Sequence, residues 1–188
     1  MQMVRLVRKG EVVKLSKRSG KAITLVTLLD EIPIDAARFY FNLREANSQF
    51  EFDLDLAVEQ SSQNPVFYVQ YAHARICSLL ANLSAEGIEI PENADLDLLD
   101  NSREIELIRH IASLPHEINL AAKSYDPAKI TKYTFDLATL FHRFYDGCSV
   151  KNAETPELMN ARILLCLAVR QTLRNALSIL NVDRPEKM

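Results

Sequence analysis

Apolar residues recur every three or four positions over most of the chain beyond residue 60, a spacing that predicts long amphipathic helices. We expect four of them, over residues 65–82, 107–122, 128–148 and from 156 onward. Asn64, Asp126 and Thr155 each stand directly before a proline, which is typical of a helix start because proline at the first helical position sacrifices no hydrogen bond. The stretch 163–169 is apolar on all sides and predicts that the last helix occupies the centre of a bundle.

The pattern before residue 60 is shorter and mixed. Residues 3–13 alternate around Lys9-Gly10, which predicts a β-hairpin, and the polar, charged stretch 14–20 predicts a mobile loop. Residues 50–56 alternate strictly and predict an edge strand or an extended connection. Two short helices are expected between these parts, one over 25–31 that stops before Pro33 and one over 36–43 with Asp35 as its N-cap. The acidic, turn-rich stretch 84–106 predicts a loop.

This arrangement predicts a mainly α protein, with a helical bundle preceded by a short α/β piece. One hairpin and one loop cannot bury their own apolar face, so we expect the chain to begin inside a larger protein. Of all residues 48 % are hydrophobic, 25 % are charged and only 4 are Gly, which excludes a collagen-like or disordered chain. No apolar run approaches the roughly 20 residues of a membrane span, and no signal peptide is recognisable. Cys77, Cys148 and Cys166 are widely spaced and predict buried free thiols in the reducing cytoplasm.

Charge is distributed unevenly along the chain. The net charge is −3, but residues 1–22 carry seven basic side chains and one acidic, or +6, whereas the other 15 basic and 24 acidic side chains give −9. We expect the start of the chain to attract phosphate. Arg162, Arg170 and Arg174 lie at multiples of four and form one basic stripe on the last helix. This stripe is either a solvated or salt-bridged face or a face that contacts phosphate.

The loop at 14–20 carries the clearest chemical signal. Lys14, Lys17 and Arg18 stand beside Ser16 and the small residues Ser19 and Gly20. A flexible cationic loop can close over a polyphosphate and neutralise the charge that develops on a leaving pyrophosphate. Taken alone, the same residues also fit a solvated basic loop.

The context of this loop is more specific. Lys14-Leu-Ser-Lys-Arg-Ser-Gly20 and the segment after it resemble the KMSKR signature of class I aminoacyl-tRNA synthetases, with Leu15 in place of the usual Met. Residues 64–77, Asn-Pro-Val-Phe-Tyr-Val-Gln-Tyr-Ala-His-Ala-Arg-Ile-Cys, closely resemble the first helix of the anticodon-binding domain of bacterial-type arginyl-tRNA synthetases. The ending 176–188 resembles the end of that family, which finishes on Met. The resemblance covers essentially the whole chain and is weakest over 84–106.

The resemblance implies three parts: the end of the catalytic domain at 1–23, a connecting, stem-contacting region at 24–62, and a helical anticodon-binding domain at 63–188. It implies an arginine–tRNA ligase that uses ATP, with Mg²⁺, to attach arginine to tRNA(Arg), in the cytoplasm and without membrane or DNA. Lys14 and Lys17, with Ser16 and Arg18, would stabilise the transition state on ATP. The His-x-Gly-His signature is absent from the sequence. We therefore expect a C-terminal piece that is inactive alone and binds no cofactor tightly.

Two interpretations of the 64–77 helix are open. Tyr68, Tyr71 and Arg75 share one helical face, and aromatic rings interleaved with Arg form a stacking platform for unpaired bases. The resemblance extends the expected tRNA contacts to Tyr145 and Met188. The other interpretation makes Tyr68, Tyr71 and Arg75 amphipathic surface residues of a core helix. We expect His73 and Phe144 to be structural.

Other chemistries find little support. His110 and His116, like His142 and Cys148, are six residues apart, which is no familiar metal-ligand spacing, so we expect no metal site. No nucleophile motif is present. The rival to a synthetase piece is a stand-alone helical adaptor that binds RNA or protein without catalysis.

Overall fold

The structure, a computed structural model, describes residues 3–13, 24–45 and 47–188. The predicted loop at 14–20, with Lys14, Ser16, Lys17 and Arg18, lies outside the described residues. The elements of the first part are β1 (Val4–Arg8), β2 (Glu11–Val12), α1 (Leu25–Glu31), α2 (Ile34–Asn42), β3 (Phe50–Asp53) and α3 (Leu54–Val58). Those of the second are α4 (Pro65–Ala85), the short 3₁₀ helix η2 (Leu96–Leu98), α5 (Ser102–Ser124), α6 (Ala128–Gly147) and α7 (Pro156–Leu180).

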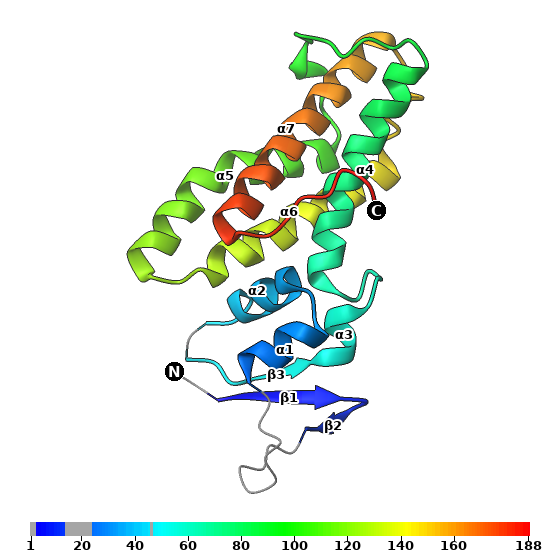
Figure 1. Ribbon diagram of the computed structural model, residues 1–188. Coiled ribbons are helices and arrows are strands. Elements are labelled where there is room, and N and C mark those ends of the chain that lie inside the picture. Colours follow the sequence, from blue (N-terminus) through cyan, green and yellow to red (C-terminus); the bar gives the residue numbers. More distant parts are fainter. Residues whose placement is uncertain (1–2, 14–23, 46) are drawn as a thin grey trace, which may run out of the picture.

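A three-stranded sheet in the order β2-β1-β3 begins the fold. The predicted hairpin is confirmed: β1 and β2 are antiparallel, and Lys9 and Gly10 both take positive φ, the conformation of a tight two-residue hairpin turn. β3 pairs in parallel with β1, so the connection crosses over through α1 and α2. In Figure 1, α2 lies between the sheet and the helical bundle.

Two predictions for this first part are wrong in detail. β3 is an edge strand, one of the two forms expected, but it ends at Asp53 rather than continuing to Leu56. The Asp53 carboxylate accepts hydrogen bonds from the backbone N–H groups of Asp55 and Leu56, which starts α3 there. Asp35 is not the N-cap of α2, because the helix begins at Ile34. Its carboxylate instead binds residues far away in the sequence.

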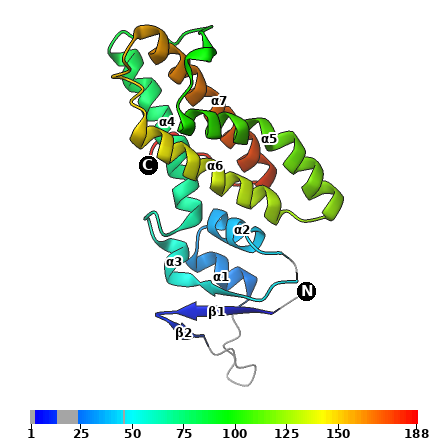
Figure 2. The same ribbon diagram turned by 180° about the vertical axis from the view of Figure 1, so that it is seen from behind.

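The second part is a bundle of α4, α5, α6 and α7 (Figures 1 and 2). α7 packs against α4, α5, α6 and α2, which confirms its predicted central place, although Ala168 of its apolar stretch is exposed. The length and hydropathy of α7 alone would allow it to cross a membrane, and half of its most apolar window is buried inside the protein. The long predicted stripe of α6 is confirmed, since Ile130, Leu137 and Phe141 are all buried.

α5 differs most from its prediction. It begins at Ser102, inside the predicted loop, because Asn101 and Glu104 form a reciprocal capping box. The expected apolar stripe is buried at Leu107 and Leu114 but reaches the surface at Ile118, which is 38 % exposed.

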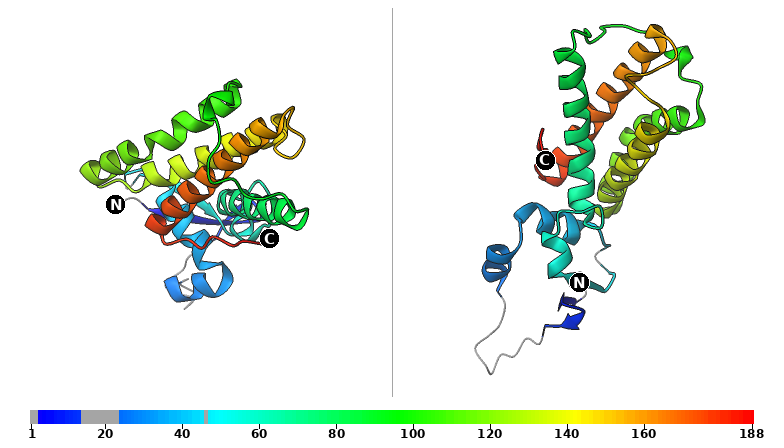
Figure 3. Two further views of the ribbon diagram at one scale, coloured as in Figure 1. Left: turned by 90° about the horizontal axis from the view of Figure 1, so that it is seen from above. Right: turned by 90° about the vertical axis from the view of Figure 1, so that its right-hand side faces the viewer.

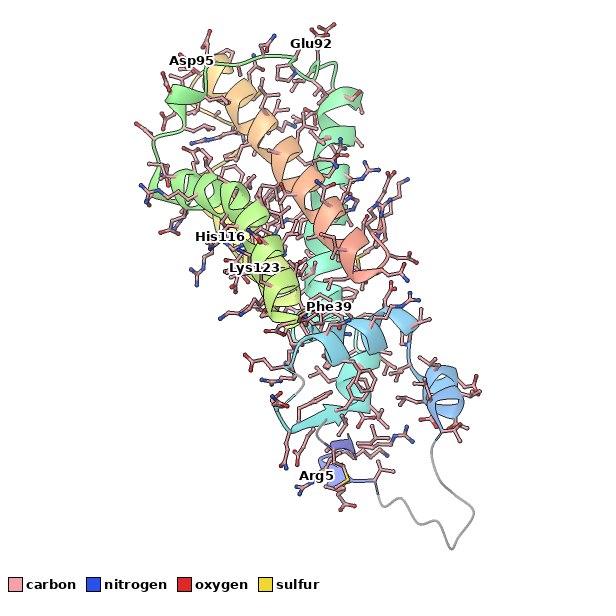
Figure 4. All side chains as sticks on the ribbon, turned by 90° about the vertical axis from the view of Figure 1, so that its left-hand side faces the viewer. Arg5, Phe39, Glu92, Asp95, His116 and Lys123 are labelled. Atoms are coloured by element: carbon pink, nitrogen blue, oxygen red, sulfur yellow. The ribbon has the colours of Figure 1, made fainter. Side chains whose placement is uncertain are left out.

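The described basic residues of the N-terminal hairpin lie among acidic residues. Figure 4 shows Arg5 at one end and Glu92 and Asp95 at the other. The basic hairpin is less free to attract phosphate than expected, because Arg5 lies 3.9 Å from Glu51 and Arg8 pairs with Glu31. The basic residues that follow Lys9 in this stretch, at positions 14–21, lie outside the described residues.

Candidate nucleic-acid interface

The start of α4 is fixed from both sides of its N-cap. The Asn64 side chain is buried, its Oδ1 accepts a hydrogen bond from the Val66 N–H, and its Nδ2 donates to the Glu59 carbonyl at 2.9 Å. Pro65 follows at the first helical position. These bonds set where the helix begins and therefore which of its faces point outward.

Three residues predicted on one face of α4 meet two from α6. Tyr68, Tyr71 and Arg75 gather around His142 and Tyr145, and we call these five the Arg75 cluster. The Tyr68 and His142 ring centroids lie 4.6 Å apart, and the Tyr71 ring stacks on His142 at 5.9 Å with an interplanar angle of 22°. Tyr71 is 41 % exposed, so one large aromatic side chain of the cluster remains open to a partner.

Arg75 sits at the centre of this cluster. Its guanidinium carbon lies 4.0 Å from the Tyr145 ring centroid and 6.0 Å from that of Tyr71, both within the range of cation–π attraction. One terminal nitrogen lies 3.4 Å from the Asp146 carboxylate, and the other lies 3.4 Å from Nδ1 of His142. A guanidinium held in place this way loses little conformational entropy when it binds a ligand.

The neutral form of His142 is favoured in this arrangement. Its side chain is buried, and burial, reinforced by the positive charge of Arg75, lowers the pKa of His142 below the ordinary 6.5. Arginine can only donate hydrogen bonds, so a neutral His142 that bonds to Arg75 accepts at Nδ1. The histidine thus orients the arginine rather than competing with it in charge.

The cluster borders a hollow in the surface. The hollow has a volume of about 440 Å³ and is lined by Tyr68, Tyr71, Arg75 and His142, together with residues 60–62 of the loop before α4. Its volume falls in the range of small-molecule sites. Aromatic faces, one guanidinium and the serine hydroxyls of that loop suit a planar base with polar edges.

The structure brings four of the predicted tRNA contacts together and separates the fifth. Tyr68, Tyr71, Arg75 and Tyr145 all belong to the Arg75 cluster. Met188 is 52 % exposed at the end of the chain, which lies against α4 on the side away from α6 (Figure 3).

Residues predicted to be structural are in the core. His73 is buried and bonds to the Pro185 carbonyl, and Phe144 is fully buried. The three cysteines are free thiols, of which Cys148 and Cys166 are buried, and burial raises the pKa of Cys166 to about 12. Cys77 is only partly buried, less than expected.

Within the described ranges, no group of three His, Cys, Asp or Glu residues is placed to hold a metal ion.

Two further residues of the site, His142 and Asp146, are given no role by the sequence pattern, in which His142 is considered as a metal ligand and rejected. Both lie on one face of α6 with Tyr145, at i, i+3 and i+4, a spacing that signals a shared surface. For one residue of the basic stripe on α7 the structure decides between the two alternatives. Arg162 forms a buried salt bridge with Glu104 and is therefore not free to contact phosphate.

Known proteins resemble this chain in both sequence and fold. An arginine–tRNA ligase of Caldanaerobacter subterraneus is 53 % identical over the whole chain, and one of Ruminiclostridium cellulolyticum is 47 % identical. The chain spans about a third of the length of these curated relatives, 34 % and 33 %. The crystal structure of an arginyl-tRNA synthetase from Campylobacter jejuni matches all of this chain, and 40 % of its own, with a TM-score of 0.86 at 31 % identity.

A Thermus thermophilus arginyl-tRNA synthetase structure shares the fold, with a TM-score of 0.78 over 97 % of this chain and 34 % of its own, at 22 % identity. The sequence profile of the DALR anticodon binding domain matches residues 69–188, which include most of α4 and all of α5, α6 and α7. The chain therefore belongs to the DALR anticodon binding domain family.

Proposed function

We propose that this chain is the tRNA-binding part of an arginine–tRNA ligase and that the Arg75 cluster binds unpaired bases of tRNA(Arg). The observation that carries the proposal is the exposed Tyr71 ring beside a guanidinium already fixed by Tyr145, His142 and Asp146. Base–aromatic stacking is tolerant of sequence, whereas the polar edges around it select the base. Membership of an anticodon-binding family supports the same ligand.

The catalytic part of the proposal rests on resemblance alone. In the full-length ligase, ATP with Mg²⁺ and arginine would be the substrates, and the enzyme would work in the cytoplasm. Lys14 and Lys17, with Ser16 and Arg18, would neutralise the charge of the leaving pyrophosphate. These residues lie outside the described residues, so the role of each follows from the sequence and from the ligases that the chain resembles. The division of the chain into the end of a catalytic domain (1–23), a connecting region (24–62) and an anticodon-binding domain (63–188) belongs to the same proposal.

A titration tests the binding part. Purified chain is mixed with labelled tRNA(Arg) and, separately, with a tRNA of another amino acid, at several salt concentrations. We expect saturable binding that is tighter for tRNA(Arg) and weakens as salt rises, since phosphate contacts release counterions. Equal affinity for both tRNAs, or no binding at low salt, would contradict the proposal.

A further inference from the structure

The last eight residues, 181–188, form an extended segment that leaves α7 and crosses to α4, and we call it the C-terminal strap (Figure 1). Asn181 ends α7 with a φ of +53°, a left-handed conformation that asparagine tolerates better than most residues. The next residue, Val182, is buried, and its N–H donates to the Leu177 carbonyl at 3.0 Å. The strap is therefore anchored to the bundle at its first step.

Side chains from two other helices hold the strap at alternate residues. Successive carbonyls of an extended chain point to opposite sides, so every second one faces the same surface. Two such carbonyls, those of Asp183 and Pro185, accept side-chain hydrogen bonds from Gln70 at 3.0 Å and from His73 at 2.9 Å. A third bond, from Arg38 to the carbonyl of the left-handed Asn181 at 2.9 Å, holds the start of the strap. Three hydrogen bonds from side chains of α2 and α4 therefore hold the strap in a defined position.

Asp35 joins the strap and both helices at one point. One oxygen of its carboxylate, Oδ2, accepts from Nε2 of Gln70 at 3.0 Å and from the backbone N–H of Asp183 at 3.1 Å. The start of α2, the second turn of α4 and the strap therefore meet at a single charged acceptor. Hydrogen bonds to an ionised acceptor are stronger than those between neutral groups.

The strap and α6 support opposite flanks of α4. Helix positions advance by about 100° each, so Tyr68 and Arg75 lie on one side of Tyr71 and Gln70 and His73 on the other. The first pair faces α6, through contacts with His142, and the second pair bonds to the strap. Tyr71 thus lies on a face of α4 that is flanked by α6 on one side and by the strap on the other.

We infer that Asp35 and Gln70 are positioning residues: by holding the C-terminal strap, they fix the face of α4 that carries Tyr71 and set its orientation relative to α2. The binding consequence rests on the proposed function, since it requires Tyr71 to contact tRNA. The position of the strap does not depend on the proposed function, because it is defined by hydrogen bonds within the chain.

The test compares two variants with two matched controls. Asp35→Asn and Gln70→Ala weaken the junction, whereas Asp30→Asn and Gln171→Ala make the same changes at exposed positions of α1 and α7. Amide hydrogen exchange at Asp183 reports the strap directly, exchange at the buried Ile76 reports the stability of α4, and a tRNA(Arg) titration reports function.

We expect exchange at Asp183 to be roughly tenfold faster in the two junction variants, with Ile76 unchanged. Asp35→Asn removes the charge from the acceptor of the Asp183 N–H, and Gln70→Ala removes the hydrogen bond to the Asp183 carbonyl. We also expect tRNA(Arg) affinity to fall about threefold to tenfold, with both controls at the level of the original chain. Unchanged exchange at Asp183 would show that the strap is not held at this junction. Faster exchange with full tRNA affinity would overturn the positioning role. If the original chain binds no tRNA(Arg), the proposed function fails, and the exchange rates still decide whether the strap is held.

Discussion

The guanidinium carbon of Arg75 lies 4.0 Å from the centroid of the Tyr145 ring, and this pair joins α4 to α6 at the surface. A cation over an aromatic face contributes about 0.5–1 kcal/mol at an exposed site, and more when it is desolvated. A stacked base would exclude water from the pair. Binding should therefore strengthen an interaction that is already present in the free chain, and mutations here should affect tRNA affinity more than folding.

Tyr71→Ala should weaken tRNA(Arg) binding about tenfold to hundredfold, since stacking one base on an aromatic ring is worth roughly 1–3 kcal/mol. The ring is 41 % exposed, so the thermal unfolding temperature should change little. Tyr125→Ala is the matched control, because Tyr125 is 93 % exposed and lies at the α5–α6 turn. A loss of affinity that only accompanies unfolding in circular dichroism melts would show that Tyr71 is a packing residue.

Arg75→Lys should lose most of the affinity that Arg75→Ala loses. Lysine keeps the charge but cannot stack on Tyr145 while bonding to both His142 and Asp146. Titrations of tRNA(Arg) over a range of salt separate the roles: removing a stacking arginine leaves the salt dependence nearly unchanged, and removing a phosphate contact makes it shallower. Arg109→Ala, at an exposed position of α5, controls for net charge. Wild-type affinity in Arg75→Lys would mean that charge alone matters.

Much of this fold follows from local sequence. Asn64-Pro65 and Thr155-Pro156 mark where α4 and α7 begin, and the 3–4 spacing of apolar residues on α6 identifies its buried face. The spacing of Tyr71 and Arg75 likewise places both on one face, because helix geometry is local.

What the sequence does not reveal depends on pairing between distant segments. Nothing local brings His142 against Tyr68, or Asp35 against Asp183, since these contacts depend on how the helices pack. The buried pair of Glu104 and Arg162 is hidden for the same reason: the arginine is visible as part of a stripe, and its partner lies in a stretch predicted to be a loop. The local pattern assigns Asp35 to the nearest helix start because its true partners are remote.

Stability should fall as the pH drops below about 6.5. Burial lowers the pKa of both His73 and His142 from the ordinary 6.5, so between those values the unfolded chain binds more protons than the folded chain. Stability from the neutral histidines is fully present above 6.5 and is lost as the pH falls through their folded-state pKa values.

Urea unfolding at about pH 7.5 and about pH 5.5 measures this dependence. His142→Asn should reduce the difference between the two pH values without abolishing it, because His73 still titrates. His116→Asn changes an exposed histidine of α5, labelled in Figure 4, and should leave the difference unchanged. The same pH dependence in all three proteins would contradict the assignment to His142.

The chain alone should not catalyse arginine-dependent exchange of pyrophosphate into ATP, because the sequence contains no His-x-Gly-His signature. In the full-length ligase, Lys17→Ala should lower kcat for arginine activation far more than it raises the KM for arginine, since charge on the leaving group appears mainly in the transition state. Radiolabelled pyrophosphate exchange measures both. Exchange by the chain itself, or a changed KM with an unchanged kcat, would count against this assignment.

Glu104→Ala should be the most destabilising single substitution among those considered. The Glu104 carboxylate is fully buried, with one oxygen 2.7 Å from Nε of Arg162 and the other accepting from the Asn101 N–H at 3.1 Å. Its removal leaves Arg162 with 12 % side-chain exposure and no carboxylate, and also opens the capping box of α5. Losing one partner of a buried ion pair costs about 3–5 kcal/mol.

The double variant with Arg162→Met separates these effects. Removing the second charge should recover part of the loss, because the unpaired buried cation is gone, while the cost of the missing cap of about 1 kcal/mol remains. Glu106→Ala, at an exposed position of the same helix, should change the free energy of unfolding by less than about 0.5 kcal/mol. Urea denaturation of the four proteins gives the values. If Glu104→Ala is no more destabilising than Glu106→Ala, the pair contributes nothing to the fold; if the double variant is less stable than Glu104→Ala, the uncompensated arginine was not the cause.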